Sequence, residues 1–419
     1  MGRSSAPEAA PTPTLPRVHG GGRPAQRVEG GRQDPHPVAL APSPAQALAA
    51  AKRLVVKIGS ALLVGDDGEI HRAWLNALVA DVARCRERGQ EIILVSSGAI
   101  AVGRRNLGLS GRALRLEEKQ AAAATGQIRL AHAYQEALGR HGITVAQILL
   151  TPEDTEERRR HLNARATFAQ LLALGAVPVV NENDTIATAE IRFGDNDRLA
   201  ARVAQMVSAD MLVLLSDIDG LYAADPRNDP NARHIALVCE IGPEIEAMAG
   251  EAPLGYSSGG MVTKIAAARI AMSAGCRMLI AKGKTTGAAP GPLAALEAGD
   301  RATLFLPRGE PRSARKAWIA GAVNPSGAVI VDDGAARALQ RGTSLLPAGI
   351  VAVEGIFERG DAVIIRTRSG IEAGRGLSAY SSADIRRIAG HKSGEIAEIL
   401  GYRGRDEIIH RDDLVVTEP

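Results

Sequence analysis

Short runs of consecutive apolar residues, separated by segments with helical periodicity, are the feature that most constrains the fold of this chain. The apolar runs lie at residues 54–56, 92–95, 145–150, 177–180, 211–215 and 278–280. Helix-length amphipathic stretches lie between most of them, at residues 72–87, 117–138, 163–174, 197–207 and 264–274. Strands that lack a polar side must be covered on both faces, as in parallel sheets. The pattern therefore predicts an α/β fold, with an open, mainly parallel sheet sandwiched by helices.

The composition and the apolar pattern of the sequence change at both ends of this α/β region. Residues 1–47 are rich in Pro, Gly and Arg and have no apolar periodicity, which predicts a disordered extension. The sequence leaves open whether this extension is a functional tail or the result of a wrongly assigned start codon. We place the α/β domain at residues 48–307 and a linker at 308–325. Short strands punctuated by glycine then predict a small β-rich domain at residues 326–419.

The composition of the chain disfavours nucleic-acid-binding, membrane and secreted proteins. The 419 residues carry 50 Lys and Arg against 47 Asp and Glu, so bulk charge gives no support to nucleic-acid binding. No apolar run is long enough to span a bilayer, and no secretory signal precedes the domain. Cys85, Cys239 and Cys276 are far apart and are interpreted as reduced core thiols, with a zinc site or redox pair as the alternative. We therefore expect a cytoplasmic protein without membrane contact.

Polar residues and glycines concentrate where the predicted strands end, which is where open parallel sheets bind ligands. Lys57 closes the first strand two residues before Gly59, and Ser97 and Gly98 follow the second strand. Each feature alone has a plainer reading: Lys57 could be a surface lysine, and the serine could simply cap a helix. The dense polar segments at residues 181–185 and 194–197 need more acceptors and donors than a turn requires, and they suit an amino acid.

A glycine-rich loop at residues 258–264 leads into a predicted helix and suits phosphate. Its glycines admit the nucleotide, Thr263 can bind oxygens, and Lys264 can reach a phosphoryl group in transfer. Ser216 and Asp217 end another strand nearby. Phosphoryl transfer depends on positioning and charge neutralisation, so two lysines, such a loop and one organising Asp form a sufficient set.

These segments together resemble the glutamate 5-kinase family of the amino-acid kinase superfamily, from about residue 53 to the C-terminus. The resemblance implies ATP-dependent phosphorylation of the glutamate side-chain carboxylate, as the first step of proline biosynthesis, with ATP as co-substrate and Mg²⁺ on its phosphates. It implies catalytic roles for Lys57, Asp217 and Lys264, with Asp217 orienting the lysines. The ATP-binding residues implied are Lys57, Ser216, Asp217, Ser258, Gly259, Gly260, Met261, Val262, Thr263 and Lys264. Those implied for glutamate are Ser97, Asp184 and Asn196, and no residue is expected to ligate a metal.

The C-terminal region resembles a PUA domain, on the segment at residues 342–350 followed by Phe357 and residues 359–361. Such domains often bind RNA, which supplies an alternative function. Aromatic residues are scarce there and charges alternate, so RNA binding is disfavoured. A kinase acting on another small carboxylate is the second alternative. The resemblance also implies a homo-oligomer, feedback inhibition by proline, and a separate reductase that consumes the product.

Overall fold

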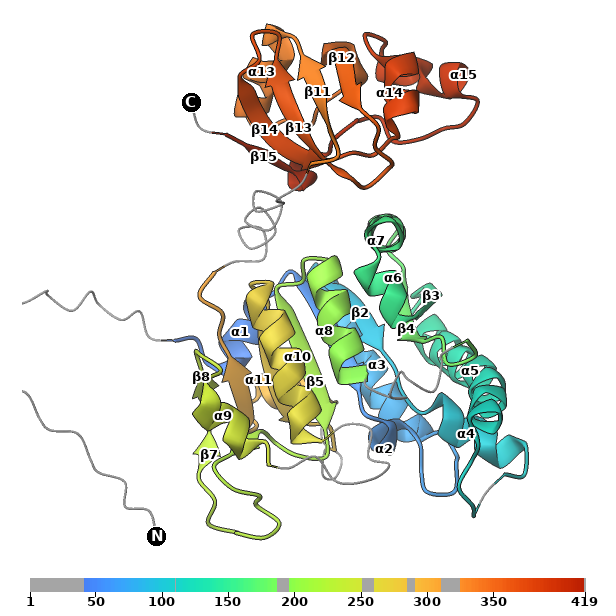
Figure 1. Cartoon of the computed structure of the whole chain (residues 1–419). Coiled ribbons are helices and arrows are strands. Elements are labelled where there is room, and N and C mark those ends of the chain that lie inside the picture. Colours follow the sequence, from blue (N-terminus) through green and yellow to red (C-terminus); the bar gives the residue numbers. More distant parts are fainter. Residues whose placement is uncertain are drawn as a thin grey trace, which may run out of the picture. The chain divides into compact units, whose positions relative to one another are not determined.

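The computed structural model describes residues 41–109, 111–186, 196–250, 260–284, 291–309 and 325–417. Figure 1 shows a larger α/β domain and a smaller β-rich domain. Across these ranges, no helix combines the length and the apolar character needed to cross a membrane.

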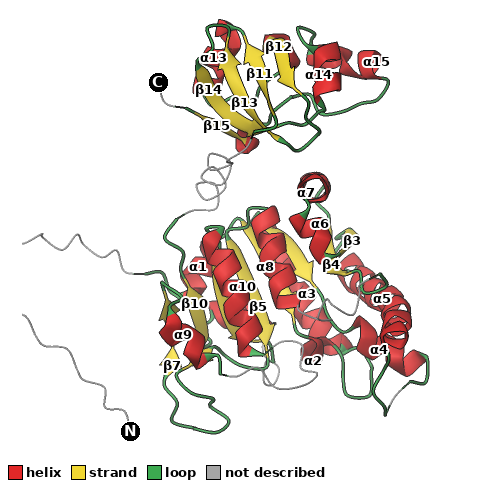
Figure 2. Ribbon diagram, viewed as in Figure 1, coloured by secondary structure: helices red, strands yellow, loops and turns green. Residues whose placement is uncertain are grey.

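The larger domain is built on an eight-stranded sheet in the order β3-β4-β2-β1-β5-β9-β10-β8. Figure 2 shows strands of this sheet in yellow with red helices packed against it. Its strands are β1 (Arg53–Ile58), β2 (Glu91–Val95), β3 (Val145–Leu150), β4 (Val177–Glu182), β5 (Met211–Ser216), β8 (Leu237–Val238), β9 (Arg277–Lys282) and β10 (Ala302–Phe305). All neighbours from β3 to β9 are parallel, and only the β9–β10 pair is antiparallel. The predicted open, mainly parallel sheet is confirmed.

Helices cover both faces of this sheet, as the apolar strands required. One core packs the sheet against α1 (Pro44–Ala50), α3 (Arg72–Glu87), α4 (Ala99–Asn106), α5 (Leu116–Gly139) and α11 (Pro292–Glu297). The other core packs it against α7 (Arg158–Ala173), α8 (Asn196–Met206) and α10 (Met261–Ser273). Shorter elements complete the domain: α2 (Ser60–Leu63), α6 (Pro152–Glu156), β6 (Leu221–Tyr222), β7 (His234–Ile235) and α9 (Pro243–Met248).

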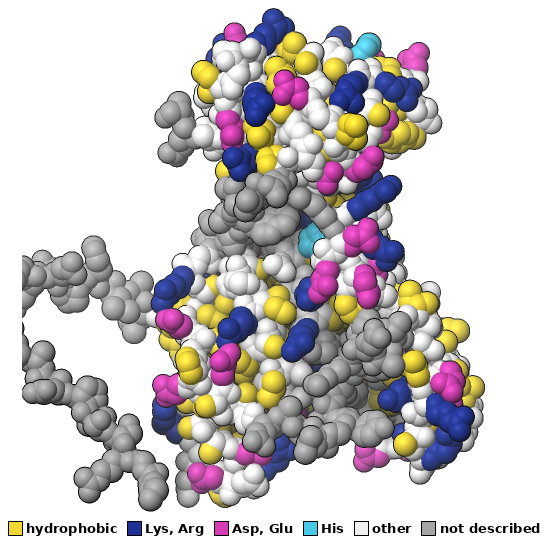
Figure 3. Space-filling view, in the orientation of Figure 1, with side chains coloured by type: hydrophobic (Ala, Val, Ile, Leu, Met, Phe, Trp, Pro, Cys, Tyr) yellow, Lys and Arg dark blue, Asp and Glu magenta, His cyan; other side chains and the backbone are white. Residues whose placement is uncertain are grey.

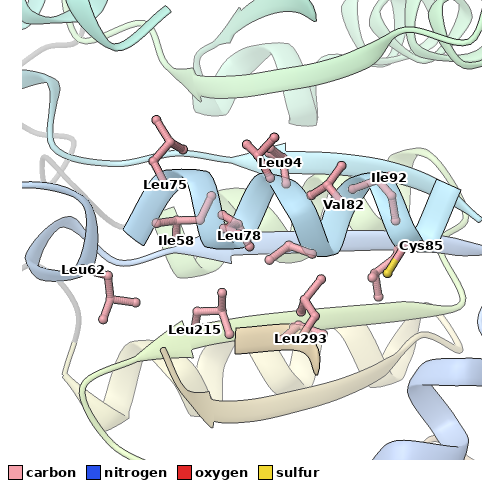
Figure 4. Packing of buried hydrophobic residues seen from close by; sticks show 14 of the residues in the cluster. Ile58, Leu62, Leu75, Leu78, Val82, Cys85, Ile92, Leu94, Leu215 and Leu293 are labelled. Carbon is pink, nitrogen blue, oxygen red and sulfur yellow. The ribbon is translucent and has the colours of Figure 1, made fainter. Parts of the chain in front are cut away.

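Alternate side chains of one strand enter the two cores. Leu54 and Val56 of β1 belong to the first core, whereas Val55 between them belongs to the second. Figure 4 shows the first core, where Leu78 and Val82 of α3 lie over the sheet. Because both faces of β1 are apolar and covered, only its carboxyl end, at Lys57, is left to carry polar chemistry.

The ordered domain begins earlier than the sequence analysis placed it. Helix α1 begins at Pro44, inside the segment predicted as an extension, while residues 1–40 lie outside the described part of the chain. Ser43 caps the helix by accepting a hydrogen bond from the Gln46 backbone, with proline at the first helical position. Leu48 is fully buried. A helix of seven residues, about two turns, is too short to produce a visible apolar period, so the pattern missed it.

The smaller domain has a five-stranded sheet in the order β12-β11-β13-β14-β15 and a core of its own. Its elements are β11 (Gly327–Val331), α13 (Asp333–Gln340), β12 (Ile350–Gly355), β13 (Ala362–Thr367), β14 (Glu372–Leu377), α14 (Ser382–Ile388), α15 (Ile396–Leu400) and β15 (Leu414–Val416). The predicted β-rich C-terminal domain is confirmed.

Candidate active site

An open crevice lies at the carboxyl ends of the parallel strands, where the topology brings the loops after β1, β2, β4 and β5 together. All the described residues assigned to the site from the sequence line this crevice: Lys57, Ser97, Asp184, Asn196, Ser216, Asp217, Gly260, Met261, Val262, Thr263 and Lys264. Ser258 and Gly259, also assigned to ATP, lie outside the described residues. The structure thus gathers in one place residues that are far apart in the sequence.

Both site lysines are buried and paired with Asp197. The Lys57 Nζ atom lies 2.8 Å from one carboxylate oxygen of Asp197, and the Lys264 Nζ atom lies 3.2 Å from the other. The Thr263 hydroxyl donates a hydrogen bond of 2.9 Å to the same carboxylate. Burial by itself would raise the pKa of Asp197, but the charges of the lysines and these hydrogen bonds lower it to about 2. Asp197 is therefore ionised at neutral pH and holds the two ammonium groups together.

Asp217 has a different environment from the one implied by the resemblance. Its side chain is exposed and accepts a hydrogen bond of 2.9 Å from the Ser216 hydroxyl. The carboxylate that contacts both lysines belongs instead to Asp197, at the start of α8. The sequence places Asp197 inside a polar segment and assigns it no role, because only the tertiary structure shows which carboxylate reaches the lysines.

The amide of Asn196, the residue before Asp197, joins the loops on the other side of the crevice. Its Nδ2 atom donates to the Ser97 hydroxyl (2.8 Å), the Ser96 carbonyl (2.8 Å) and the Asn181 Oδ1 atom (3.2 Å). Its Oδ1 atom is buried and has no hydrogen-bond partner among the described residues. Because a buried acceptor without a partner is costly, this oxygen suits a donor supplied by a ligand.

Two buried carboxyl groups, Glu182 and Asp184, lie on the same side of the crevice. Burial, together with the negative charge of Glu182, raises the pKa of Asp184 to about 7. A cation placed against Asp184 would favour its ionised form. The acceptors gathered here, Asp184 and the Asn196 Oδ1 atom, therefore match the ammonium group of an amino acid.

Two helix N-termini face the crevice. Helix α10 starts at Met261, directly after Gly260, and both residues line the crevice. Helix α4 starts at Ala99, after Gly98, whose φ of 99° is a left-handed conformation that favours glycine. Free N–H groups at such termini bind anions, which here suits phosphate at α10 and a carboxylate at α4.

The amino acid kinase family matches residues 52–282, and the PUA domain matches residues 327–400. The chain belongs to the amino acid kinase family. The resemblance inferred from the motifs is confirmed, and the β-rich C-terminal domain is a PUA domain.

Two curated relatives of this amino acid kinase carry the name glutamate 5-kinase. A protein of Paramagnetospirillum magneticum named glutamate 5-kinase is 66% identical over 370 residues, which cover 88% of this chain and 99% of the relative. Glutamate 5-kinase 1 of Rhizobium meliloti is 60% identical over 368 residues, covering 88% of this chain and 93% of the relative. Among solved structures, carbamate kinase from Giardia lamblia bound to AMP-PNP is 15% identical, with a TM-score of 0.43 over 62% of this chain and 99% of that one.

The PUA domain of this amino acid kinase has a mixed surface. On the face shown in Figure 3, basic and acidic side chains are interspersed over its described residues. Several arginines of the PUA domain are paired with carboxylates, among them Arg366 with Glu354 and Arg375 with Glu372. Interspersed charge does not favour nucleic-acid binding by this face.

Two of the three cysteines are buried, as expected, and the third is exposed. Cys85 and Cys276 are buried, and burial raises the pKa of both thiols, as expected of core thiols. Cys239 is exposed and is not part of a core. Within the described ranges, no group of three or more His, Cys, Asp or Glu residues could hold a metal ion.

Proposed function

We propose that this protein transfers the γ-phosphoryl group of ATP to the side-chain carboxylate of L-glutamate, giving glutamate 5-phosphate for proline biosynthesis. The observation that carries the proposal is the crevice itself. It joins a buried cluster of two lysines to a set of acceptors suited to an amino acid's ammonium group, in a chain whose relatives are named glutamate 5-kinase.

Glutamate occupies the side of the crevice formed by Ser97, Asp184 and Asn196. Its ammonium group binds the Asp184 carboxylate and the Asn196 Oδ1 atom, the buried acceptor without a described partner. The Ser97 hydroxyl and the N-terminus of α4 bind a substrate carboxylate. These contacts leave the side-chain carboxylate directed toward the two lysines.

The nucleotide occupies the other side, along Ser216, Asp217 and the N-terminus of α10. Mg²⁺ would enter with ATP as part of the substrate and would supply positive charge at its phosphates. Gly260 and the residues that follow it hold the phosphates at the helix N-terminus.

The reaction is an in-line displacement. An oxygen of the glutamate side-chain carboxylate attacks the γ-phosphorus, the bond to the β-phosphate oxygen breaks, and ADP leaves. The attacking carboxylate is already ionised, so no general base is required. Lys57 and Lys264 stabilise the charge on the phosphoryl group in transfer, and Asp197 holds both lysines in position.

The test is the formation of an acyl phosphate, trapped with hydroxylamine, in the presence of ATP and Mg²⁺. The intact chain should give hydroxamate from glutamate but not from aspartate, and Lys264→Ala and Asp184→Ala should both abolish it. Hydroxamate from aspartate, acetylglutamate or another acceptor in preference to glutamate would contradict the substrate assignment. Retained activity in both variants would contradict the site.

The remaining expectations are part of the same proposal. Acyl phosphates hydrolyse readily, so a reductase should take the product directly. We also propose a cytoplasmic location, a homo-oligomeric state and inhibition by proline. Phosphorylation assays with added proline and sedimentation analysis of the purified chain test the last two.

A further inference from the structure

Helix α5 sends two polar side chains inward beneath the glutamate side of the crevice, and the proposed mechanism uses neither. Tyr134 is fully buried, and its hydroxyl donates a hydrogen bond of 3.1 Å to the Ser96 hydroxyl. The Gln127 Oε1 atom accepts a hydrogen bond of 2.7 Å from the Asn181 amide. Residues seven apart lie on one face of a helix, so α5 presents both side chains to the ends of β2 and β4.

The hydrogen bonds of this network fix which way each amide points. The Asn181 Oδ1 atom accepts from the Glu182 backbone N–H (3.0 Å), which can only donate. The Asn181 Nδ2 atom must therefore face the Gln127 Oε1 atom. On the other side, the Asn196 Nδ2 atom donates to the Ser96 carbonyl, which can only accept, and to Asn181. The Asn196 Oδ1 atom is thereby left as a buried acceptor without a partner among the described residues.

Helix α5 is itself held at a fixed distance from the substrate loop. It packs so closely on α4 that a Cβ atom at Gly126 would lie 1.8 Å from the Ala99 carbonyl oxygen. A Cβ atom at Gly103 would lie 1.7 Å from the Ala122 oxygen. Ala99 follows Ser97 and Gly98 directly, so this backbone contact ties Gln127 and Tyr134 to the loop that they support.

We propose that Gln127 and Tyr134 are positioning residues of the glutamate subsite. Gln127 acts through Asn181 on the Asn196 amide, and Tyr134 acts through Ser96 on the end of β2 that carries Ser97. Neither side chain is among those that line the crevice. The inference rests on the proposed function, because it assumes that Ser97 and Asn196 bind glutamate.

Steady-state kinetics of hydroxamate formation, with glutamate and ATP varied separately, test this inference. Gln127→Met removes the acceptor at nearly constant size, and Tyr134→Phe removes only a hydroxyl. Each should raise the KM for glutamate about three- to tenfold, the range expected for one hydrogen bond, and leave the KM for ATP within about twofold. Gln127→Glu keeps an acceptor at the same place and should restore the KM for glutamate.

Tyr380→Phe is the matched control. Tyr380 is a buried tyrosine of the PUA domain whose hydroxyl donates to the Arg405 carbonyl, so the variant loses the same group without touching this network. It should leave both KM values unchanged. An unchanged KM for glutamate in Gln127→Met and Tyr134→Phe, or an equal rise in both KM values, would overturn the inference.

Two further variants distinguish a failure of the positioning role from a failure of the proposed glutamate subsite. Ser97→Ala and Asn196→Ala alter the proposed glutamate contacts directly and should raise the KM for glutamate more than the α5 variants do. If they raise it and the α5 variants do not, only the positioning role is wrong. If neither of them raises it, the glutamate subsite itself is wrongly placed, and the positioning role falls with it.

Discussion

The carboxylate of Asp197 allows this chain to bury two lysines at the centre of its site. Lys57 and Lys264 are 8% and 4% exposed, and an ammonium group at such depth is costly without an anionic partner. Asp197 contacts both and is itself 1% exposed. The arrangement fixes two long, flexible side chains next to one another, and in the proposed mechanism they stabilise the charge that develops in phosphoryl transfer.

Replacement of this carboxylate should therefore affect rate and stability together. In Asp197→Asn we expect kcat to fall on the order of a hundredfold, because both lysines lose their fixed positions. The free energy of unfolding should fall by about 3–5 kcal/mol, as for other broken buried ion pairs. Hydroxamate kinetics and urea denaturation measure the two effects. Asp217→Asn should lower kcat far less than Asp197→Asn does. An equal fall in kcat would indicate that Asp217 orients the lysines.

The raised pKa of Asp184 predicts a pH dependence. With a pKa of about 7 in the free protein, the carboxyl proposed to bind ammonium is mostly ionised at pH 8 and mostly protonated at pH 6. The kcat/KM for glutamate should thus fall about tenfold from pH 8 to pH 6. Asp184→Asn should lower kcat/KM and flatten its pH profile over this range. Substrate ionisation is common to both proteins, so identical profiles would exclude Asp184 as the titrating group.

The same shift has a consequence for stability. The pKa of Asp184 in the folded protein lies above its ordinary value of 3.8, so the folded state binds the proton more tightly than the unfolded state. The stability that this proton contributes is fully present below pH 3.8 and is lost as the pH rises through 7. Urea denaturation between pH 5 and 8 measures this effect. The contribution of Asp184 should lower the free energy of unfolding of the unaltered chain as the pH rises, and this contribution should be absent in Asp184→Asn.

At the scale of elements, the contact between α4 and α5 sets the geometry of the substrate loop. Gly103 and Gly126 let the two helices approach until backbone meets backbone. Glycine within a helix is intrinsically unfavourable relative to alanine. Its presence at both contact positions is explained by the close approach.

Gly126→Ala should accordingly be destabilising, since its Cβ atom would overlap the Ala99 carbonyl oxygen and force the helices apart. We expect the free energy of unfolding to fall by about 1–3 kcal/mol, together with a higher KM for glutamate. Gly139→Ala, near the end of α5, is the matched control, because a Cβ atom there would meet no other atom within 4 Å. Equal melting temperatures for the two variants would contradict the packing argument.

At the scale of the whole molecule, each domain has a hydrophobic core of its own, and the described site residues all lie in the kinase domain. Removal of residues 325–419 should therefore leave phosphorylation of glutamate within about threefold of the full chain. We expect the deletion to change sensitivity to proline instead, which hydroxamate assays with added proline would show. Loss of kcat in a truncated chain that keeps its melting transition would show that the PUA domain contributes to catalysis.

Local pattern was sufficient to predict the fold class and most of the residues that line the candidate site. Apolar runs predicted the parallel sheet, since a strand covered on both faces needs no polar side, and the bounds of α5 agree with prediction to within one residue. Lys57, Ser97 and Asp184 were predicted because polar residues gather at the carboxyl ends of parallel strands. Lys264 was predicted because it ends a glycine-rich loop that leads into a helix.

Pairings between distant residues were decided only by the tertiary structure. The sequence by itself determined which loops carry polar groups, because each loop shows its own composition. It did not determine that Asp197, rather than Asp217, contacts Lys57 and Lys264, nor that Gln127 orients Asn181. Those partners depend on strand order, on helix packing and on the burial that makes an unpaired charge costly. These properties arise only when segments far apart in the chain come together.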